Sequence, residues 1–304
     1  MSDPAALISV DSYGLSDVGL IRTNNEDSFL IATAGSEIVS QNPAELTGVI
    51  AGSGTMFIVA DGMGGAQAGE VASRMAVELV ARNFLAAIAE KESLDRQTTI
   101  KILTDAVQEA NQLIFQEGQQ NSDLSGMGTT LTAATVFDTT ILFAQLGDSR
   151  AYLARGGTIS QMTKDQSLVA QMVASGKIKA EEAKTHPQRN VILQALGIQN
   201  QVDVAISSAE LRRGDQIVLC SDGLSGKVDA EEIKELLERF EPKAACQALV
   251  RTARERGGED NITVVVARFN GNGLAEPQID DTAHSNNKKM EAERWRFHWP
   301  WRRS

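Results

Sequence analysis

Apolar residues follow two different periods along the chain, and the two periods alternate. Helical spacing first appears over residues 71–88 and again over 103–114, where each set predicts a helix with one buried face. The same spacing returns over residues 233–240 and 245–253. The pattern therefore predicts two pairs of amphipathic helices, one pair in each half of the chain.

Around these helices, short runs rich in Val, Ile, Leu and Thr are bounded by turn residues and predict β-strands. The runs occupy residues 57–60, 129–137, 140–146, 149–154, 202–206, 216–220 and 262–269. Residues 18–31 are predicted as a strand pair or one long strand, and 161–200 as a polar stretch with short helical pieces. Residues 32–55 predict a long loop, which is an insertion, a flexible rim or a weak element. The order of elements indicates one layered α+β domain in which helices cover a β-sandwich.

The composition of the chain limits the kinds of molecule that we expect it to bind. The formal net charge of −11 disfavours nucleic acid and anionic membrane surfaces as main partners. The chain shows no basic-then-apolar leader, and no uncharged apolar stretch reaches the ~20 residues that a membrane span needs. We therefore expect a cytoplasmic protein, and a monomer. Cys220 and Cys246 match no metal-ligand spacing and are expected to be buried thiols, with a disulfide as the alternative.

The C-terminal region differs in composition from the rest. We place the domain in residues 1–270, and residues 271–287 are predicted as a disordered linker. All three tryptophans lie in the basic last stretch of the 271–304 tail. Two alternatives are open for this tail: an apolar knob that folds back on the domain, or a contact with a membrane surface or a protein.

Carboxylates recur where apolar runs begin or end. Two runs end in the same dipeptide, Asp61-Gly62 and Asp222-Gly223, where the glycine permits a sharp exit from a strand. Glu26-Asp27 lies in a strand-like segment, and Asp260 opens the last apolar run. Taken singly, each is typical of an ordinary turn or a solvated strand edge. Together, in a chain with few histidines, they predict an oxygen cage for hard divalent cations, a kind of site that usually acts on phosphates.

Arg22 lies four residues before Glu26. In an extended strand, alternation puts both side chains on one face. A guanidinium there would point at an anion held by the cations, which adds a phosphate-binding group to the predicted cage.

Six short motifs occur in order between residues 13 and 270. They are Arg22-Thr-Asn-Asn-Glu26-Asp27-Ser-Phe, Val59-Ala-Asp61-Gly62-Met-Gly-Gly65, Gly126-Met-Gly-Thr-Thr130, Gly147-Asp148-Ser149-Arg150, Ser221-Asp222-Gly223-Leu224 and Asp260-Asn261-Ile262-Thr263. Each is weak alone, but the ordered set resembles the metal-dependent serine/threonine protein phosphatases, also called type 2C phosphatases. The resemblance implies a four-layer α-β-β-α sandwich, in which paired helices flank a central antiparallel β-sandwich.

The same resemblance implies a phosphatase that acts on phosphoserine and phosphothreonine in proteins through two Mg²⁺ or Mn²⁺ ions bridged by a hydroxide. The implied partners are phosphorylated proteins and a cognate serine/threonine kinase. The implied roles are as follows: Asp61 bridges both ions, Asp222 and Asp260 complete one shell, Glu26 and the Gly62 carbonyl serve the other, Asp27 orients bound waters, Arg22 binds the substrate phosphate, and Asp148 with Asp222 holds a third, weaker ion.

Two positions need separate comment. Met63 stands where many eukaryotic members have a histidine regarded as the general acid, so Met63 resembles the bacterial branch and the leaving-group proton must come from elsewhere. His186 lies in residues 161–197, which correspond to the family's flap, and is expected to contact substrate or to cap or pack. Two other functions are open: a catalytically silent binding module on this fold, and a hydrolase of another phosphomonoester.

Overall fold

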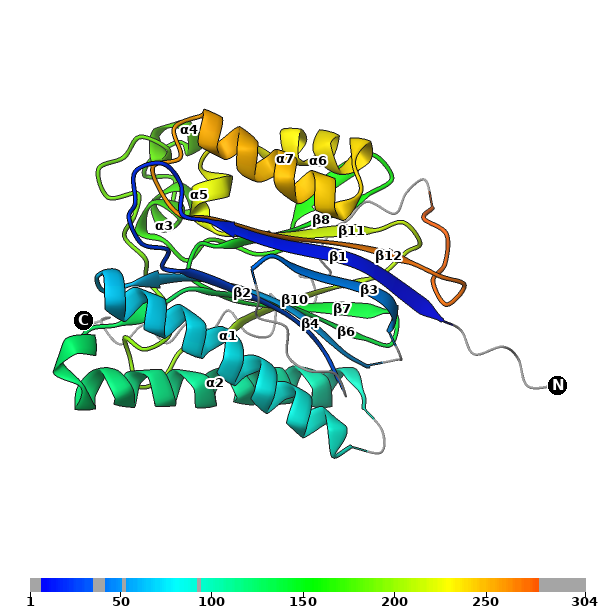
Figure 1. Cartoon of the computed structure of the whole chain (residues 1–304), viewed down its shortest axis with the longest axis horizontal. Coiled ribbons are helices and arrows are strands. Elements are labelled where there is room, and N and C mark those ends of the chain that lie inside the picture. Colours follow the sequence, from blue (N-terminus) through cyan, green and yellow to red (C-terminus); the bar gives the residue numbers. More distant parts are fainter. Residues whose placement is uncertain (1–6, 35–41, 51–52, 92–93, 279–304) are drawn as a thin grey trace.

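Two antiparallel β-sheets pack face to face at the centre of the computed structural model, which describes residues 7–34, 42–50, 53–91 and 94–278 (Figure 1). The first sheet contains β1 (Ile8–Asp17), β3 (Ala44–Ile50), β8 (Arg150–Arg155), β9 (Thr158–Gln161), β11 (Gln216–Cys220) and β12 (Ile262–Asn270). The second contains β2 (Asp27–Thr33), β4 (Ser53–Met63), β5 (Gly128–Thr129), β6 (Leu131–Phe137), β7 (Thr140–Leu146) and β10 (Ala205–Glu210). The strand orders are β3-β1-β12-β11-β8-β9 and β10-β7-β6-β4-β2, with β5 paired to β4.

Helices cover both outer faces of the sandwich (Figure 1). The second sheet is covered by α1 (Ala66–Ala89) and α2 (Arg96–Gln120), and the first by α6 (Ala230–Arg239) and α7 (Pro242–Glu255). Shorter helices are η1 (Ser122–Leu124), α3 (Leu168–Ala174), α4 (Ala180–Ala183) and α5 (Asp222–Ser225). The predicted four-layer α-β-β-α sandwich with two helix pairs is confirmed. No helix in the described part of the chain is long and apolar enough to cross a bilayer.

Three buried apolar layers separate these four layers. The layer between the sheets includes Phe57 and Phe269, whose rings meet edge to face with centroids 6.2 Å apart. Phe84 belongs to the layer under α1 and α2, and Ile233 and Leu249 to that under α6 and α7. Burial of each such side chain stabilises the fold by about 1.5–3 kcal/mol, so the sheets hold their relative position firmly.

The N-terminal region differs most from the sequence prediction. Residues 18–26 form a loop, and β2 starts only at Asp27, so the predicted strand over residues 18–31 is mostly wrong. Residues 32–55, predicted as a long loop, contain in their described part the end of β2, all of β3 and the start of β4. β1 was not predicted at all, because its buried positions include small residues such as Ser12 and Ser16.

The described chain also extends past the domain boundary expected at residue 270. Leu274 is buried and joins the layer between the sheets, and Ala275 pairs with Arg212. The predicted linker is therefore wrong for residues 271–278, which pack on the domain. The rest of that linker and the Trp- and Arg-rich stretch, residues 279–304, lie outside the described residues.

Candidate active site

Two of the predicted ligands, Asp27 and Asp61, lie directly opposite each other on the neighbouring strands β2 and β4. Asp27 is buried, and its Oδ2 accepts a hydrogen bond of 2.7 Å from the hydroxyl of Ser221, which follows β11 in the other sheet. Burial raises the pKa of Asp27 to about 7, against the hydrogen bonds from Ser221 and Thr263, which lower it. Asp27 and Asp61 thus lie at the place where the two sheets meet.

The main chain of Asp61 is fixed by the segment Gly126-Met-Gly-Thr-Thr130. The Asp61 N–H donates to Thr130 Oγ1, and the Asp61 carbonyl accepts from Thr130 N–H and Thr129 Oγ1, each at 2.9 Å. Beyond Asp61, Met63 pairs with Gly128 at the end of β4. This motif therefore sets the direction in which the Asp61 side chain leaves the strand, a role that sequence reasoning did not assign.

Gly62 is required because α1 approaches the strand closely. A Cβ at Gly62 would lie 2.2 Å from the carbonyl oxygen of Gly69 and 2.7 Å from that of Glu26. The Gly62 N–H donates to the Glu26 carbonyl at 3.1 Å. A Cβ at Gly69 would in turn lie 2.8 Å from the Glu26 carboxylate, so Glu26 lies against the first turns of α1 beside Asp61.

Asn261 joins the loop of residues 18–26 to the start of β12. Its side-chain oxygen accepts from the Glu26 N–H at 2.8 Å, and its amide donates to the carbonyls of Val18 and Asn24. Only an amide side chain can accept and donate in this way, whereas a carboxylate could only accept. Sequence reasoning treated Asn261 as part of a turn and as a member of the last motif, and it assigned this residue no role of its own.

Arg22 lies on the same loop and forms an ion pair with Asp260, with 3.0 Å between Nη2 and the carboxylate. The Arg22 side chain is 48% exposed, so the guanidinium borders solvent at the edge of the cluster. The prediction that Arg22 and Glu26 share a strand face is wrong, because these residues are not in a strand. The loop nevertheless brings them close: burial raises the pKa of Glu26, and the charge of Arg22 opposes that rise.

Asp222 is the first residue of α5, just after β11. A Cβ at Gly223 would lie 1.9 Å from the carbonyl oxygen of Asn261, so α5 packs directly on the chain that precedes β12. This contact explains why Asp222 senses Asp260: burial and then the Asp260 charge raise the pKa of Asp222.

Four other carboxylates act on the charge of Asp61. Burial, followed by the charges of Asp27, Asp222, Asp148 and Asp260, raises the pKa of Asp61 well above its ordinary value. Such a cluster must hold protons or cations, because it cannot carry all its charges alone. Among the described residues, no three acidic, His or Cys side chains already converge on one point. A cation here would therefore keep several water ligands, as Mg²⁺ usually does.

Asp148 lies in the turn between β7 and β8. Its Oδ1 is buried and has no hydrogen-bond partner among the residues that the structure describes. Burial, followed by the charges of Asp222 and Asp165, raises the pKa of Asp148 to about 7. A buried carboxylate oxygen without a donor is costly unless a proton or a cation satisfies it. This oxygen and the all-oxygen donor set both fit a hard divalent cation.

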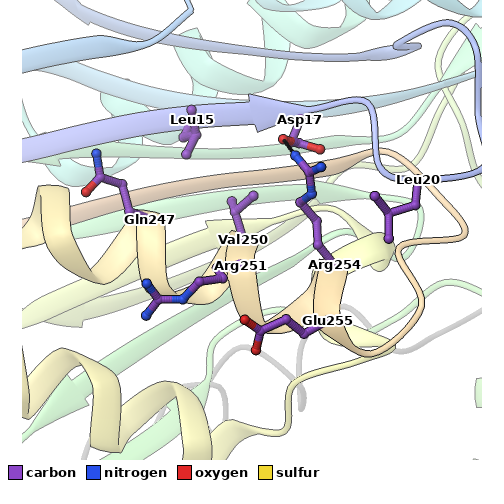
Figure 2. A pocket seen from close by; sticks show the side chains of 8 residues that line it. All are labelled: Leu15, Asp17, Leu20, Gln247, Val250, Arg251, Arg254 and Glu255. Carbon is purple, nitrogen blue, oxygen red and sulfur yellow. Dashed lines mark hydrogen bonds and ion pairs between the residues drawn. The ribbon is translucent and has the colours of Figure 1, made fainter.

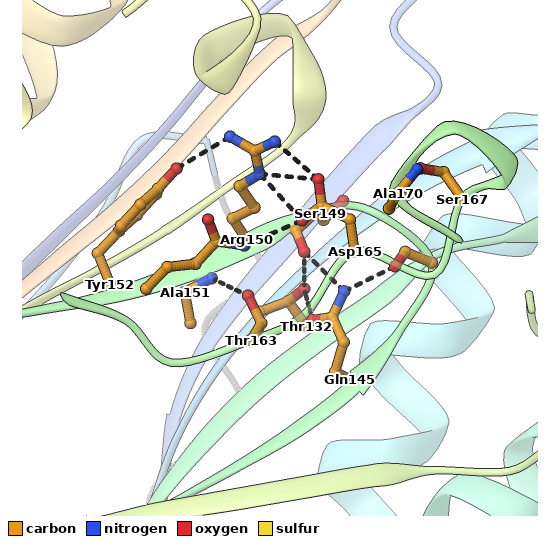
Figure 3. Close-up of polar contacts among 12 residues, drawn as sticks. Thr132, Gln145, Ser149, Arg150, Ala151, Tyr152, Thr163, Asp165, Ser167 and Ala170 are labelled. Atoms are coloured by element: carbon orange, nitrogen blue, oxygen red, sulfur yellow. Dashed lines mark hydrogen bonds and ion pairs between the residues drawn. The ribbon is translucent and has the colours of Figure 1, made fainter. Parts of the chain in front are cut away.

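A polar network holds the turn that carries Asp148 (Figure 3). Arg150 makes a bidentate pair with Asp165, with 2.7 Å between Nη2 and Oδ2, and its Nη1 donates to the Tyr152 hydroxyl. Gln145 Nε2 donates to the Ser149 carbonyl at 2.7 Å. Bidentate guanidinium contacts are geometrically strict, so the backbone on the β8 side of Asp148 is well fixed.

The structure gives His186 and the two thiols no contact with the carboxylates. His186 follows α4, and its Nδ1 accepts from the N–H of Gln188 at 3.1 Å, a local contact of the capping kind. Cys220 and Cys246 are buried and free, as predicted, and the alternative of a disulfide is wrong. Burial raises the pKa of Cys220 to about 12, so this thiol is no nucleophile at neutral pH.

A groove of about 440 Å³ lies between β1 and α7 and contains none of the predicted ligands (Figure 2). Its apolar lining includes Leu15 and Val250, and an ion pair of 2.6 Å joins Arg254 to Asp17 at its side. The described residues that line the groove include only two carboxylates, and one of them, Asp17, is already paired with Arg254, so the groove lacks the set of free acidic oxygens that a cation needs.

Comparison with known proteins identifies the family of the chain. The family model described as protein phosphatase 2C matches residues 45–264. The serine/threonine phosphatase stp of Listeria welshimeri is 37% identical over 216 residues, which cover 71% of this chain and 84% of that protein. Protein phosphatase PhpP of Streptococcus pneumoniae is 35% identical over 259 residues, which cover 84% and 96% of the two chains.

Solved structures show the same relationship. The serine/threonine phosphatase PstP/Ppp of Mycobacterium tuberculosis has a TM-score of 0.71 at 36% identity, covering 88% of this chain and 100% of its own. A catalytic domain of PstP in complex with two manganese ions has a TM-score of 0.70 at 34% identity, covering 86% and 99%. The chain is thus a member of the protein phosphatase 2C family, in its bacterial branch, and a protein-serine/threonine phosphatase.

Proposed function

We propose that this phosphatase hydrolyses phosphoserine and phosphothreonine in proteins with two divalent cations, Mg²⁺ or Mn²⁺, held by the carboxylate cluster. The observation that carries the proposal is the convergence of acidic side chains from both sheets: Asp27 lies opposite Asp61 and accepts from Ser221 of the other sheet, and Asp148 has a buried oxygen with no partner among the described residues. The two manganese ions in the related PstP structure support the same choice of cofactor.

We carry the ligand roles over from the family motifs. Asp61 would serve both ions, Asp222 and Asp260 would complete the shell of one, and Glu26 with the Gly62 carbonyl would serve the other. Asp148, whose buried Oδ1 has no partner in the described part of the chain, would hold a third and weaker ion together with Asp222. When bound, the ions supply a water of lowered pKa and neutralise charge on the phosphoryl oxygens.

The chain's own residues orient the reacting groups. Asp27, whose Oδ2 accepts from Ser221, would orient waters of the site. Arg22 exchanges its ion pair with Asp260 for a bidentate contact with the substrate phosphate, since a guanidinium matches both anions equally well. Met63 has no proton to give, so the leaving serine or threonine oxygen takes its proton from a water or from a carboxyl group of raised pKa.

Further properties follow as part of the same proposal. The partners are phosphoproteins and a serine/threonine kinase whose products this enzyme reverses, and the enzyme works as a monomer in the cytoplasm. Its catalytic domain comprises residues 1–270 with the packed segment 271–278, and the Trp- and Arg-rich stretch follows this domain in the sequence. His186 contacts the substrate protein only at the periphery of the site.

A direct test is phosphate release from a phosphothreonine peptide in the presence of Mn²⁺, of Mg²⁺, or of excess chelator. We expect turnover with either cation and none with chelator. Full turnover in excess chelator would contradict the two-cation mechanism. No turnover under any condition would favour a silent binding module on this fold.

The same assay distinguishes the substrate class. A protein phosphatase should show a higher kcat/KM for phosphopeptides than for a small phosphomonoester, because the polypeptide adds contacts. A preference for small phosphomonoesters would favour the alternative hydrolase.

A further inference from the structure

One surface segment is attached to the sheets through a narrow neck. We keep the name flap for residues 167–194, the outer part of the 161–197 stretch. They contain α3 and α4 and are largely exposed between 171 and 190. The two ends of the flap pair with each other: Leu193 N–H donates to the Gln166 carbonyl, and Leu168 N–H donates to the Val191 carbonyl, both at 2.8 Å. Gln166 therefore stands at the junction of flap and sheet.

Gln166 forms hydrogen bonds with both backbone polar groups of Gly147. Its N–H donates to the Gly147 carbonyl at 2.8 Å, and its side-chain Oε1 accepts from the Gly147 N–H at 3.0 Å. Gly147 has φ of 91°, and a Cβ there would lie 2.6 Å from a methyl carbon of Thr130, so this backbone has little freedom of its own. The next residue is Asp148, whose Oδ1 is buried and unsatisfied among the described residues.

The other end of the neck leads to a second carboxylate. Leu196 exchanges backbone hydrogen bonds with Thr129, at 2.9 and 3.1 Å. Thr129 Oγ1 in turn donates to the Asp61 carbonyl at 2.9 Å. The flap is thus anchored at two points. At one, Gln166 bonds Gly147, which precedes Asp148; at the other, Leu196 bonds Thr129, which donates to the Asp61 carbonyl.

We propose that Gln166 is a positioning residue that couples the flap to Asp148. A displacement of the flap pulls on the Leu193–Gln166 bond, moves Gly147, and so changes where the Asp148 carboxylate lies. Val191 and Leu193 are 41% and 39% exposed at the neck. A protein substrate that packs on these two side chains would therefore displace the residues that form the neck's hydrogen bonds. The inference rests on the proposed cation-binding role of Asp148.

The test compares Gln166→Met, which keeps the side-chain length but removes the acceptor, with Gln171→Met on exposed α3 as the matched control. With Gln166→Met we expect kcat to fall about 10–100-fold, the range for loss of a residue that orients a ligand. The Mn²⁺ concentration for half-maximal rate should rise, and the KM for a small phosphomonoester should change little. Gln171→Met should behave like the unmodified enzyme.

A second readout needs neither metal nor turnover. In the metal-free protein, hydrogen exchange of the Gly147 amide should accelerate with Gln166→Met and return toward the original rate with Gln166→Glu, which keeps an acceptor. Exchange that rises equally at the Leu142 amide, within β7, would indicate global destabilisation and would overturn the positioning role. An unchanged Gly147 rate would overturn it as well.

A double substitution separates this inference from the proposed function. If Gln166 acts through Asp148, Gln166→Met should lower kcat no further in an Asp148→Ala background. Independent, additive losses would refute the coupling while leaving Asp148 as a ligand. Full turnover of Asp148→Ala alone would instead refute the proposed role of Asp148, and the coupling with it.

Discussion

The guanidinium of Arg22 lies 3.0 Å from the carboxylate of Asp260, and both side chains are more than one-third exposed. The group proposed to bind phosphate is therefore held, before substrate arrives, by a group proposed to bind a cation. This pairing keeps Arg22 ordered at the edge of the site. An exposed pair is worth only about 0–1 kcal/mol, so a phosphate can replace it at little cost.

Arg22→Ala should raise the KM for a phosphopeptide about tenfold, because a charge-assisted hydrogen bond contributes roughly 1.5–3 kcal/mol and part of it is screened here. The value of kcat should fall less. Steady-state kinetics at saturating Mn²⁺ would measure both. Arg213→Ala is the matched control, since Arg213 forms an exposed ion pair with Glu276 near the far end of β12. An unchanged kcat/KM for Arg22→Ala would make the Asp260 contact purely structural.

Asp61→Asn and Asp222→Asn should each lower kcat by at least about 100-fold, because cation-assisted stabilisation of the transition state amounts to several kcal/mol. The fold should persist. Without metal, the melting temperature should rise, since each substitution removes one carboxylate from a buried cluster whose members repel one another. Near-normal activity of either variant at saturating Mn²⁺ would contradict the ligand assignment.

The stability of the metal-free protein should depend on pH. Burial raises the pKa of both Asp27 and Asp148 from 3.8 to about 7, so the folded state retains protons that the unfolded chain has lost. Stability should therefore fall as the pH rises from about 4 to about 7, by at most about 1.4 kcal/mol per pH unit for each group. Thermal unfolding at several pH values in chelator would measure this slope.

Saturating Mn²⁺ should abolish most of this slope, because a bound cation stabilises the ionised carboxylates. The matched variant Asp27→Asn should reduce the slope in chelator. A metal-free protein that becomes more stable between pH 5 and pH 7 would contradict the raised pKa of these two side chains.

Gly62→Ala should destabilise the protein by about 1–3 kcal/mol, the usual cost of forcing an added methyl into a packed site. The physical reason is that the new Cβ would lie 2.2 Å from the Gly69 carbonyl, and neither main chain can yield easily. Thermal unfolding measures the change. Gly118→Ala on α2 is the control: its Cβ would meet its nearest atoms at an ordinary 3.4 Å, so we expect no loss, or a gain of about 0.5–1 kcal/mol. Equal melting temperatures for the two variants would contradict this account.

The helices and central strands were predictable because their apolar side chains repeat with a clear period. β1 was not, because close packing replaces large side chains there: a Cβ at Gly14 would lie 2.2 Å from the ring of Phe29. β3 lies at the edge of its sheet and is held by pairing with β1, and backbone pairing leaves no mark in the sequence.

The candidate site, like the fold, could be predicted from the sequence only in part. Carboxylates at the ends of apolar runs were visible as Asp-Gly and Asp-Asn pairs, and the structure brings Asp61, Asp222 and Asp260 within reach of one another's charge. Thr130 and Asn261 stood in two of the motifs, but their supporting roles were not visible, since they and Gln166 act through bonds to main chain far away in sequence. An amide or hydroxyl in a loop has no pattern that distinguishes such a bond from exposure to water.

The carboxylates come from both halves of the sandwich: Asp27 and Asp61 from the second sheet, Asp222 and Asp260 from strand ends of the first. Neither sheet alone carries a complete set. A chain that has formed its sheets but has not yet docked them would have secondary structure and no activity. Turnover can therefore report the meeting of the two sheets, and the recovery of activity after dilution from denaturant into Mn²⁺ would follow that step.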